Sequence, residues 1–244
     1  NLNMSTVEII QLALFESLGN RLVTQTFDET TGEYIYNSIT SPEDIALIVG
    51  KDYVEFNMMI KGTVLDTTLP INFDVAVPGL GLSIDSDIEI KLDYLMAFGF
   101  GFSTTQGLYF ITNGASADGD EIQLDLTVNF SDQNGQPSSL TGELAVLTLE
   151  VVDILKNDAR DTDDKASGLF GSLNIDIQGG ENGRLSVSNY HDMTIEVAMS
   201  ASADLDLDTK ISLGGEFVNF STILHYSQDL ANYRWNSVSG SQSS

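Results

Sequence analysis

Alternation of apolar and polar residues with a period of two constrains the fold of this chain more than any other feature. The longest run occupies even-numbered positions, is interrupted only at Ser86, and comprises Leu80, Leu82, Ile84, Ile88, Ile90, Leu92, Tyr94, Met96, Phe98, Phe100 and Phe102. The odd positions between them include Ser83, Asp85, Asp87, Glu89, Lys91 and Asp93. Because successive side chains of a strand point to opposite faces, this pattern predicts half-buried strands with one apolar and one polar face.

The unbroken parity of this run limits how it can turn. A two-residue turn at Asp85-Ser86 would place Ile84 and Asp87 on the same face, which the pattern disfavours. A three-residue loop from Asp85 to Asp87 preserves the parity, and so does one long bent strand. A single strand would be about 75 Å long at roughly 3.3 Å per residue, far beyond common strand lengths. We therefore expect the hairpin, unless the domain is elongated.

Shorter alternating segments predict further strands, and an N-terminal segment predicts a helix. The strands are expected at residues 54–60, 71–77, 107–112, 121–130, 143–152, 169–177, 184–188, 193–199, 203–207 and 216–225, and Gly-containing pairs such as Asp118-Gly119 supply turns. A capping box at Ser5 to Glu8 and a stop at Gly19-Asn20 bound the helix, about Ser5 to Leu18. Its apolar positions are Val7, Ile9, Ile10, Leu12, Leu14, Phe15 and Leu18. The predicted fold class is all-β, an antiparallel sandwich or elongated β-sheet domain with one N-terminal amphipathic helix packed on the sheet.

Length and composition are those of one folded domain. The 244 residues are 42% hydrophobic, which is enough for a sizeable core. We expect a single domain over 1–244, with the acidic loop near 157–165 as the one plausible internal boundary and 237–244 as a flexible tail or tether. Since the chain starts at Asn1, we expect it to be a mature fragment or one segment of a longer polypeptide.

The charge excludes whole classes of partner. Thirty-six acidic residues against ten basic ones give a net charge of −26, which repels nucleic acid and anionic lipid surfaces. There is no cysteine, so disulfides and thiolate metal sites are excluded. No apolar stretch reaches the roughly 18 residues of a membrane-spanning helix.

Catalytic and sugar-binding patterns are weak. The two histidines, His191 and His225, lack a triad or metal-ligand spacing, and we expect both to be surface or packing residues. With so many acids, carboxylate pairs of the glycosidase kind arise by chance. Aromatic residues that could stack on a sugar are scattered along the chain, at Tyr34, Tyr36, Tyr53 and Trp235.

Acidic clusters are the one chemically suggestive feature. Four carboxylates on a predicted loop, Asp158, Asp161, Asp163 and Asp164, are candidate ligands for Ca²⁺, completed by Ser167 and backbone carbonyls. Neither this loop nor a smaller group at Asp118, Asp120 and Glu121 matches a known calcium motif. Asp204, Asp206 and Asp208 alternate with leucines, and we expect them to form the solvated face of a strand.

Several segments resemble modules repeated in very large, acidic, calcium-associated surface proteins of environmental and marine bacteria. The resemblance lies in residues 69–82, in Phe98 to Phe102, in 107–110, in the helix-then-strand opening from Ser5 to Phe27, and in 168–177. Together they cover under half the chain. The resemblance implies an extracellular structural or adhesive role without catalysis, and no binding residue can be carried over from it.

The leading hypothesis is therefore a non-catalytic structural module of a bacterial surface protein or extracellular filament. Its partners would be other copies of the same chain or repeat, and Ca²⁺ is the candidate stabilising ion. A glycan-binding adhesin domain is the alternative. A lipid-cradling or outer-membrane β protein ranks third, because acids are dense on one face, and an enzyme ranks last.

Overall fold

The structure is a computed structural model that describes residues 4–77, 80–112, 119–129, 139–144, 147–154, 160, 167–180, 182–213 and 216–236. Only the backbone is described at 71–77, 80–86, 139–144, 147 and 216–221. One helix, α1 (Thr6–Leu18), precedes the strands. The strands are β1 (Leu22–Asp28), β2 (Glu33–Ser38), β3 (Ala46–Val49), β4 (Tyr53–Val77), β5 (Leu80–Ser103), β6 (Gly107–Ile111), β7 (Ile122–Asn129), β8 (Ser139–Leu144), β9 (Leu147–Asp153), β10 (Gly168–Gln178), β11 (Arg184–Ser186), β12 (Thr194–Leu213) and β13 (Glu216–Asn236). Short 3-10 helices lie at Gly19–Arg21, Pro42–Asp44 and Tyr190–Asp192.

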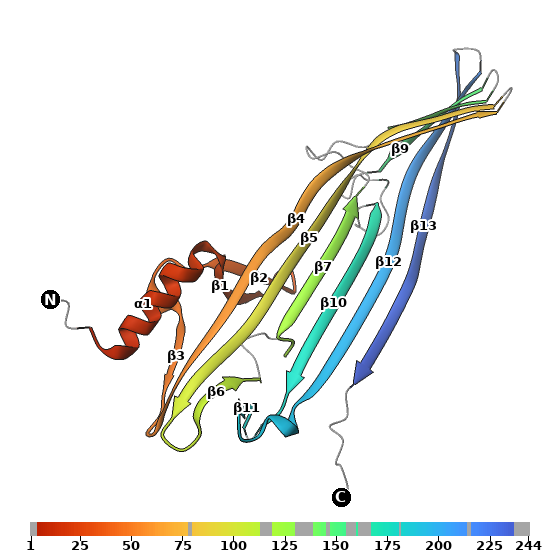
Figure 1. The fold of residues 1–244 in the computed structure, drawn as a ribbon. Helices are drawn as coiled ribbons and strands as arrows, with labels where there is room; N and C mark the ends of the chain where they lie inside the picture. Colours follow the sequence, from red (N-terminus) through yellow and green to blue (C-terminus); the bar gives the residue numbers. More distant parts are fainter. Residues whose placement is uncertain are drawn as a thin grey trace, which may run out of the picture.

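The strands form one open antiparallel sheet, which confirms the all-β class with one helix. Four long strands run the length of the sheet, β4 beside β5 on one side and β12 beside β13 on the other (Figure 1). Between them, β7 and β10 fill the half nearer α1, while β8 and β9 fill the far half. The antiparallel pairs β7–β10 and β8–β9 thus lie end to end between the long hairpins β4–β5 and β12–β13.

The expected hairpin at Asp85 to Asp87 is wrong, because β5 runs unbroken through these residues. Its ladder with β4 continues from Tyr53↔Ser103 to Val77↔Leu80. Likewise 54–60 and 71–77 belong to the single strand β4, and 193–199 and 203–207 to β12. The segment expected at 143–152 is instead divided between β8 and β9. Each long strand has an equally long neighbour that satisfies its backbone groups, so nothing forces a turn.

Helix α1 packs on one end of the sheet. Ser5 caps it in a box in which the Glu8 N–H donates to the Ser5 Oγ over 3.3 Å and the Glu8 carboxylate accepts from the Ser5 N–H over 2.6 Å. Gly19 ends it at φ +55°, in the left-handed region. The helix contributes Val7, Ile10, Leu14, Phe15 and Leu18 to a core that contains Leu22, Ile39, Ile45, Phe56 and Met58. Ile9 of the predicted apolar face is instead 53% exposed.

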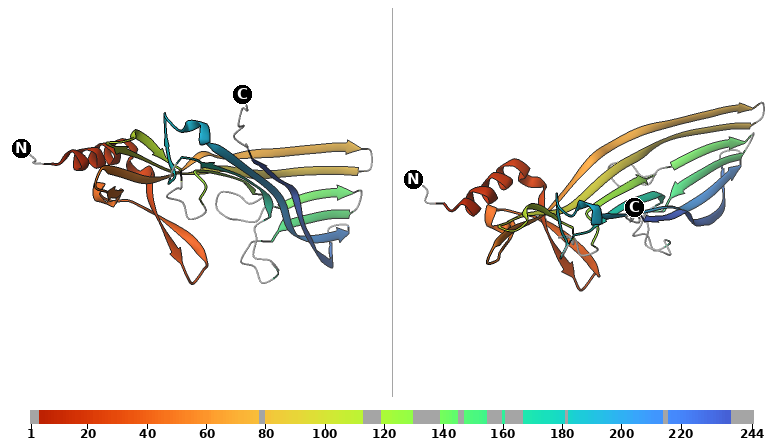
Figure 2. Two further views of the ribbon diagram at one scale, coloured as in Figure 1. Left: turned by 90° about the horizontal axis from the view of Figure 1, so that it is seen from below. Right: turned by 60° about the horizontal axis from the view of Figure 1, so that its bottom comes forward.

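The opposite face of the sheet is covered at the same end by the β1–β2 hairpin. Val23 and Tyr36 of this hairpin pack on Met59, Leu95 and Ala97. The core therefore sits at one end of the molecule, with α1 on one face and a hairpin on the other (Figure 2).

The aromatic series at the end of β5 is buried only where α1 covers it. Phe98 and Phe100 pack against the α1 core, and Phe100 stacks on Phe56 with ring centroids 5.2 Å apart. Phe102 is 46% exposed, so the apolar positions of this series are not all buried.

Candidate functional site

The face of the sheet that carries α1 continues beyond the helix as four rows of uncharged side chains across six strands. The first row is Ile60, Met96, Ile122, Ile175, Val197 and Trp235. The second is Gly62, Tyr94, Leu124, Leu173, Met199 and Tyr233. The third is Leu65, Leu92, Leu126, Gly171, Ala201 and Ala231. The fourth is Thr67, Ile90, Val128, Leu169, Ala203 and Gln228. We call these four rows the apolar face.

Two β-bulges keep the apolar face continuous. The β4 register skips Val64 between Thr63 and Leu65, and the β13 register skips Leu230 opposite Ala201 and Ser202. Each extra residue reverses the parity of the strand, so the apolar positions change from even to odd numbers without changing face. Sequence parity alone therefore hides how far this face extends.

The opposite face carries the charge. Its positions in the same part of the sheet include Lys61, Asp66, Glu89, Lys91, Asp93, Asp125, Asp204, Asp229 and Arg234. Lys91 and Asp93 form an ion pair of 3.0 Å on this face. The sheet is thus amphipathic across its whole width, with the acids gathered on one side.

Large side chains of the apolar face are left in contact with solvent. Exposed fractions reach 40% at Leu126, 42% at Leu169 and 45% at Met199, in the middle of the sheet. At the β13 edge, Tyr233 and Trp235 are also about half exposed. Within the described part of the chain, α1 is the one helix of more than three residues, and its contacts are with the core at one end.

A second feature is the junction at which β9 ends and β10 begins. β12 pairs with β10 as far as Asp204↔Gly168 and with β9 from Leu207↔Asp153. The gap in the ladder is closed by Ile154, whose N–H donates to the Asp206 carbonyl over 2.8 Å, and by Ser167, whose Oγ accepts from the Asp206 N–H over 2.8 Å. Ser167 and Ile154 are almost fully buried here.

Carboxylates crowd this junction. Asp204, Asp206 and Asp208 are 4%, 2% and 7% exposed, so the expectation that they form a solvated face is wrong. They do lie on the polar face, but partners cover them: Ser227 donates to Asp204, His225 contacts Asp206, and Arg160 pairs with Asp208 over 2.6 Å. The Oδ2 of Asp206 and the Oδ1 of Asp153 are buried without a hydrogen-bond partner. Burial, together with the negative charge of the nearby Asp206, raises the pKa of Asp153. The hydrogen bond from Ser167 lowers this pKa but does not cancel the rise.

The predicted calcium ligands Asp158, Asp161, Asp163 and Asp164 lie outside the described residues. The structure does place both ends of their loop, since Ile154 and Ser167 meet at the junction. Arg160, from within the loop, reaches Asp208. Among the residues that are described, no three acidic or histidine side chains converge as a metal site.

A buried polar cluster ties the end of β4 to the short strands β6 and β11. Glu55 accepts hydrogen bonds from the Tyr109 hydroxyl over 2.9 Å and from the Arg184 Nε over 2.8 Å. The Arg184 guanidinium lies 4.0 Å from the Tyr53 ring centroid. Gly101 leaves the room for Tyr109, because a Cβ at this position would lie 2.5 Å from the tyrosine ring. All the hydrogen-bonded groups are paired within the protein, so the arrangement is a structural clamp.

Glu121 is a buried acid beside Ile177 that is only partly satisfied. Its Oε2 accepts from the Ile177 N–H, whereas its Oε1 is buried and has no hydrogen-bond partner. Burial, with the charges of Asp176 and Asp120, raises the pKa of Glu121 to about 7. The sequence itself marks Glu121 only as part of an acidic turn.

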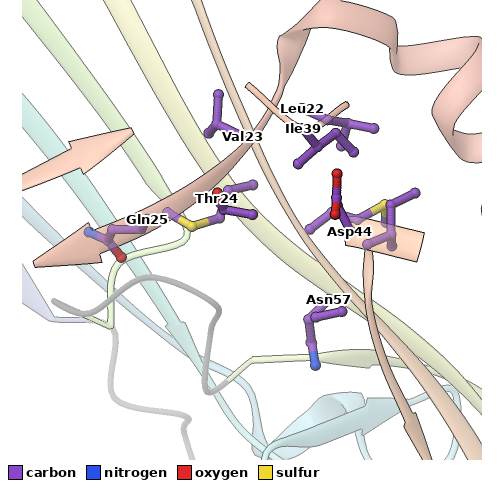
Figure 3. Close-up of a pocket in the computed structure, with 11 residues that line it drawn as sticks. Leu22, Val23, Thr24, Gln25, Ile39, Asp44 and Asn57 are labelled. Carbon is purple, nitrogen blue, oxygen red and sulfur yellow. The ribbon is translucent and has the colours of Figure 1, made fainter. Parts of the chain in front are cut away.

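Two cavities lie away from the apolar face. One, of about 240 Å³, is an open pocket lined mainly by β1, β4 and the segment before β3, and its acid Asp44 already accepts from the backbone N–H groups of Thr40 and Ser41 (Figure 3). The other, of about 460 Å³, is lined mainly by glycines and polar residues, among them Thr112, Gly179 and Gly183. The first is smaller than typical small-molecule sites, and neither gathers several charged groups.

The structure does not bring the candidate sugar-stacking residues together. Tyr34 and Tyr36 are on the β1–β2 hairpin and Tyr53 lies under Arg184, whereas Trp235 is on β13 at the other edge of the sheet. Tyr233 is the aromatic neighbour of Trp235, two residues away on the same face.

Comparisons with known proteins give no relative to this chain: no family model, no curated protein and no solved structure matches it. The described helices include none that is both long and apolar enough to cross a bilayer.

Proposed function

We propose that this chain is a non-catalytic structural module of an extracellular bacterial surface protein or filament. The observation that carries the proposal is the amphipathic sheet itself. Strands of 20 to 25 residues extend far beyond the covered core and leave a wide apolar face exposed. Such a face is an interaction surface, since soluble monomers rarely expose apolar patches of more than a few hundred Å².

The charged face suits a module packed at high density outside the cell. Its acids repel neighbouring copies on that side and keep the assembly hydrated. Calcium would lower this repulsion, with the Asp158 to Asp164 loop as its proposed site. The buried carboxylates of Asp153 and Asp206 at the ends of this loop add to the local negative field.

Immunogold labelling of the source cells, together with negative-stain imaging of material released from them, tests this function. We expect label on the outer surface and an ordered layer or fibres that contain the chain. Label confined to the cell interior, or a freely diffusing monomer in the medium, would contradict the proposal.

Tyr233 and Trp235 support a second candidate, a glycan-binding adhesin. Both rings are about half exposed on one face, as in a stacking platform for sugars. A glycan array that shows saturable binding, lost in Trp235→Ala and retained in Tyr34→Ala, would favour this function over a purely structural one.

A further inference from the structure

The apolar face needs a cover that the described chain does not supply. It holds about two dozen positions, close to the roughly 20–30 residues that each partner contributes to a standard interface. Its central side chains Leu126, Leu169 and Met199 are 40–45% exposed, although each lies in the interior of a six-stranded sheet. Burying them is worth about 25 cal/mol for each Å² of apolar area removed from water.

The charge distribution favours a second copy of the chain as the partner that covers the apolar face. The chain carries a net charge of −26, so most surfaces of one copy repel another copy. The apolar face is the exception, because none of its four rows contains an acidic or basic residue. Two copies that meet through this face keep their acids on the two outer sides, as far apart as the sheets allow.

The shape of the apolar face also favours a second copy of the chain. An acyl chain or other small apolar ligand requires a groove or cavity, and the two described cavities lie elsewhere. A broad sheet face is complementary to another sheet, and sheets pack about 10 Å apart with their side chains interdigitated. Along β12 the large Met199 is followed on this face by the small residues Ala201 and Ala203, and Gly171 lies beside Ala201 on β10. The face therefore has both ridges and recesses.

We propose that a second copy of this chain covers the apolar face, so that two sheets pack face to face as a β-sandwich related by a two-fold axis. This inference rests on the self-association in the proposed function and specifies its surface. A two-fold contact uses the same patch on both copies, which is the commonest arrangement in homo-oligomers. Helix α1 stands on the same face and sets the limit of the overlap, because the partner sheet must stop where the helix begins.

Met199→Glu is the test, with Ser200→Glu as its matched control. Met199 is 45% exposed on the apolar face, whereas its neighbour Ser200 is exposed on the polar face, where its hydroxyl contacts that of Ser172. Both variants add the same charge one residue apart. In the dimer, Met199→Glu buries an unpaired carboxylate in each copy, while in the monomer the carboxylate stays hydrated and the fold is retained.

Sedimentation velocity and light scattering from about 1 to 100 µM protein give the result. We expect a dimer for the wild type and for Ser200→Glu, and a dissociation constant at least about 100-fold higher for Met199→Glu, as expected for a charge in the centre of an interface. Leu126→Glu on β7 is an independent second variant and should behave like Met199→Glu. Far-UV circular dichroism of all variants checks that the sheet is intact.

Three results would overturn the inference. A wild-type chain that stays monomeric at 100 µM has no such partner, and a monomer that floats with neutral phosphatidylcholine vesicles has a lipid surface as its cover instead. A dimer that Met199→Glu and Leu126→Glu leave unchanged associates through another surface. In that last case the structural function still stands, because surface labelling of the cells tests it separately.

Discussion

Single buried carboxylates set how this protein responds to pH. Glu121 is the clearest of them, because its Oε1 has no partner and the pKa of its carboxyl is raised to about 7. Burial and, secondarily, Asp93 also raise the pKa of Asp125, and burial does the same for Asp153. Because burial disfavours the ionised form, each of these carboxyl groups destabilises the folded state when it loses its proton.

The Glu121→Gln variant isolates this effect. The folded-state pKa of Glu121 lies above its unfolded value, so its contribution to stability is fully present below about pH 4.5 and is lost as pH rises through about 7. Between pH 5 and pH 8 we expect the free energy of unfolding of the wild type to fall by about 2 kcal/mol more than that of the variant, with allowance for screening by solvent. Urea titrations at several pH values measure the difference. Parallel pH profiles of the two proteins would show that Glu121 titrates normally.

Phe56 and Phe102 test where the core lies. Phe56 is fully buried under α1, while Phe102, close by on the same face, is 46% exposed. We expect Phe56→Ala to cost about 3–5 kcal/mol of unfolding free energy and Phe102→Ala under about 1 kcal/mol. Equal losses in chemical denaturation would mean that the core extends past the helix.

Among the elements, the junction between the central strand pairs β7–β10 and β8–β9 interrupts the regular ladder of β12. The Ser167 hydroxyl replaces a backbone partner there, and unpaired oxygens of Asp153 and Asp206 are buried beside it. The loop from Ile154 to Ser167 leaves and re-enters the sheet at this point. Any ion that the loop binds would therefore stabilise the adjoining ends of β9 and β10.

Calcium is expected to stabilise the folded chain through this loop. With a dissociation constant of about 0.1–1 mM, typical of weak extracellular sites, 10 mM Ca²⁺ should raise the melting temperature by about 3–10 °C. The variant Asp161→Asn with Asp163→Asn should lose most of this shift. Thermal melts with Ca²⁺, with chelator and with NaCl of matched ionic strength measure this shift. A wild-type midpoint that rises no more in Ca²⁺ than in NaCl would show that the loop is not a calcium site.

Period-two patterning was enough to predict the class of fold, and the capping box with its glycine stop was enough to predict the helix. Neither signal predicts the length of the strands or the extent of the apolar face. Parity does not distinguish a three-residue loop from a continuous strand, and common strand lengths favour the loop, which is why the sequence predicts a hairpin within β5. It also reverses at the bulges of Val64 and Leu230, so the matching faces of neighbouring strands are visible only in the register. The buried state of Asp206 depends on His225 and on the β9–β10 junction, which local sequence does not specify.

At the scale of the whole molecule, the core and the exposed sheet have different sources of stability. The end near α1 buries its own apolar side chains on both faces. On the long strands beyond it, one face carries the ion pair of Lys91 and Asp93, whereas the apolar face leaves large side chains exposed to solvent. If a second copy covers the apolar face, as we propose, the chain gains much of its stability from assembly.

Thermal stability should therefore depend on protein concentration. If a dimer unfolds to separate chains, a 100-fold rise in concentration adds about 1.4 kcal/mol per protomer, or roughly 3–5 °C for a chain of this size. Differential scanning calorimetry from about 1 to 100 µM should show this rise for the wild type and for Ser200→Glu. Met199→Glu should melt at one lower temperature over the whole range, because its monomer gains nothing from mass action. A wild-type midpoint that is constant across this range, in a transition shown to be reversible, would mean that the exposed sheet is stable without a partner.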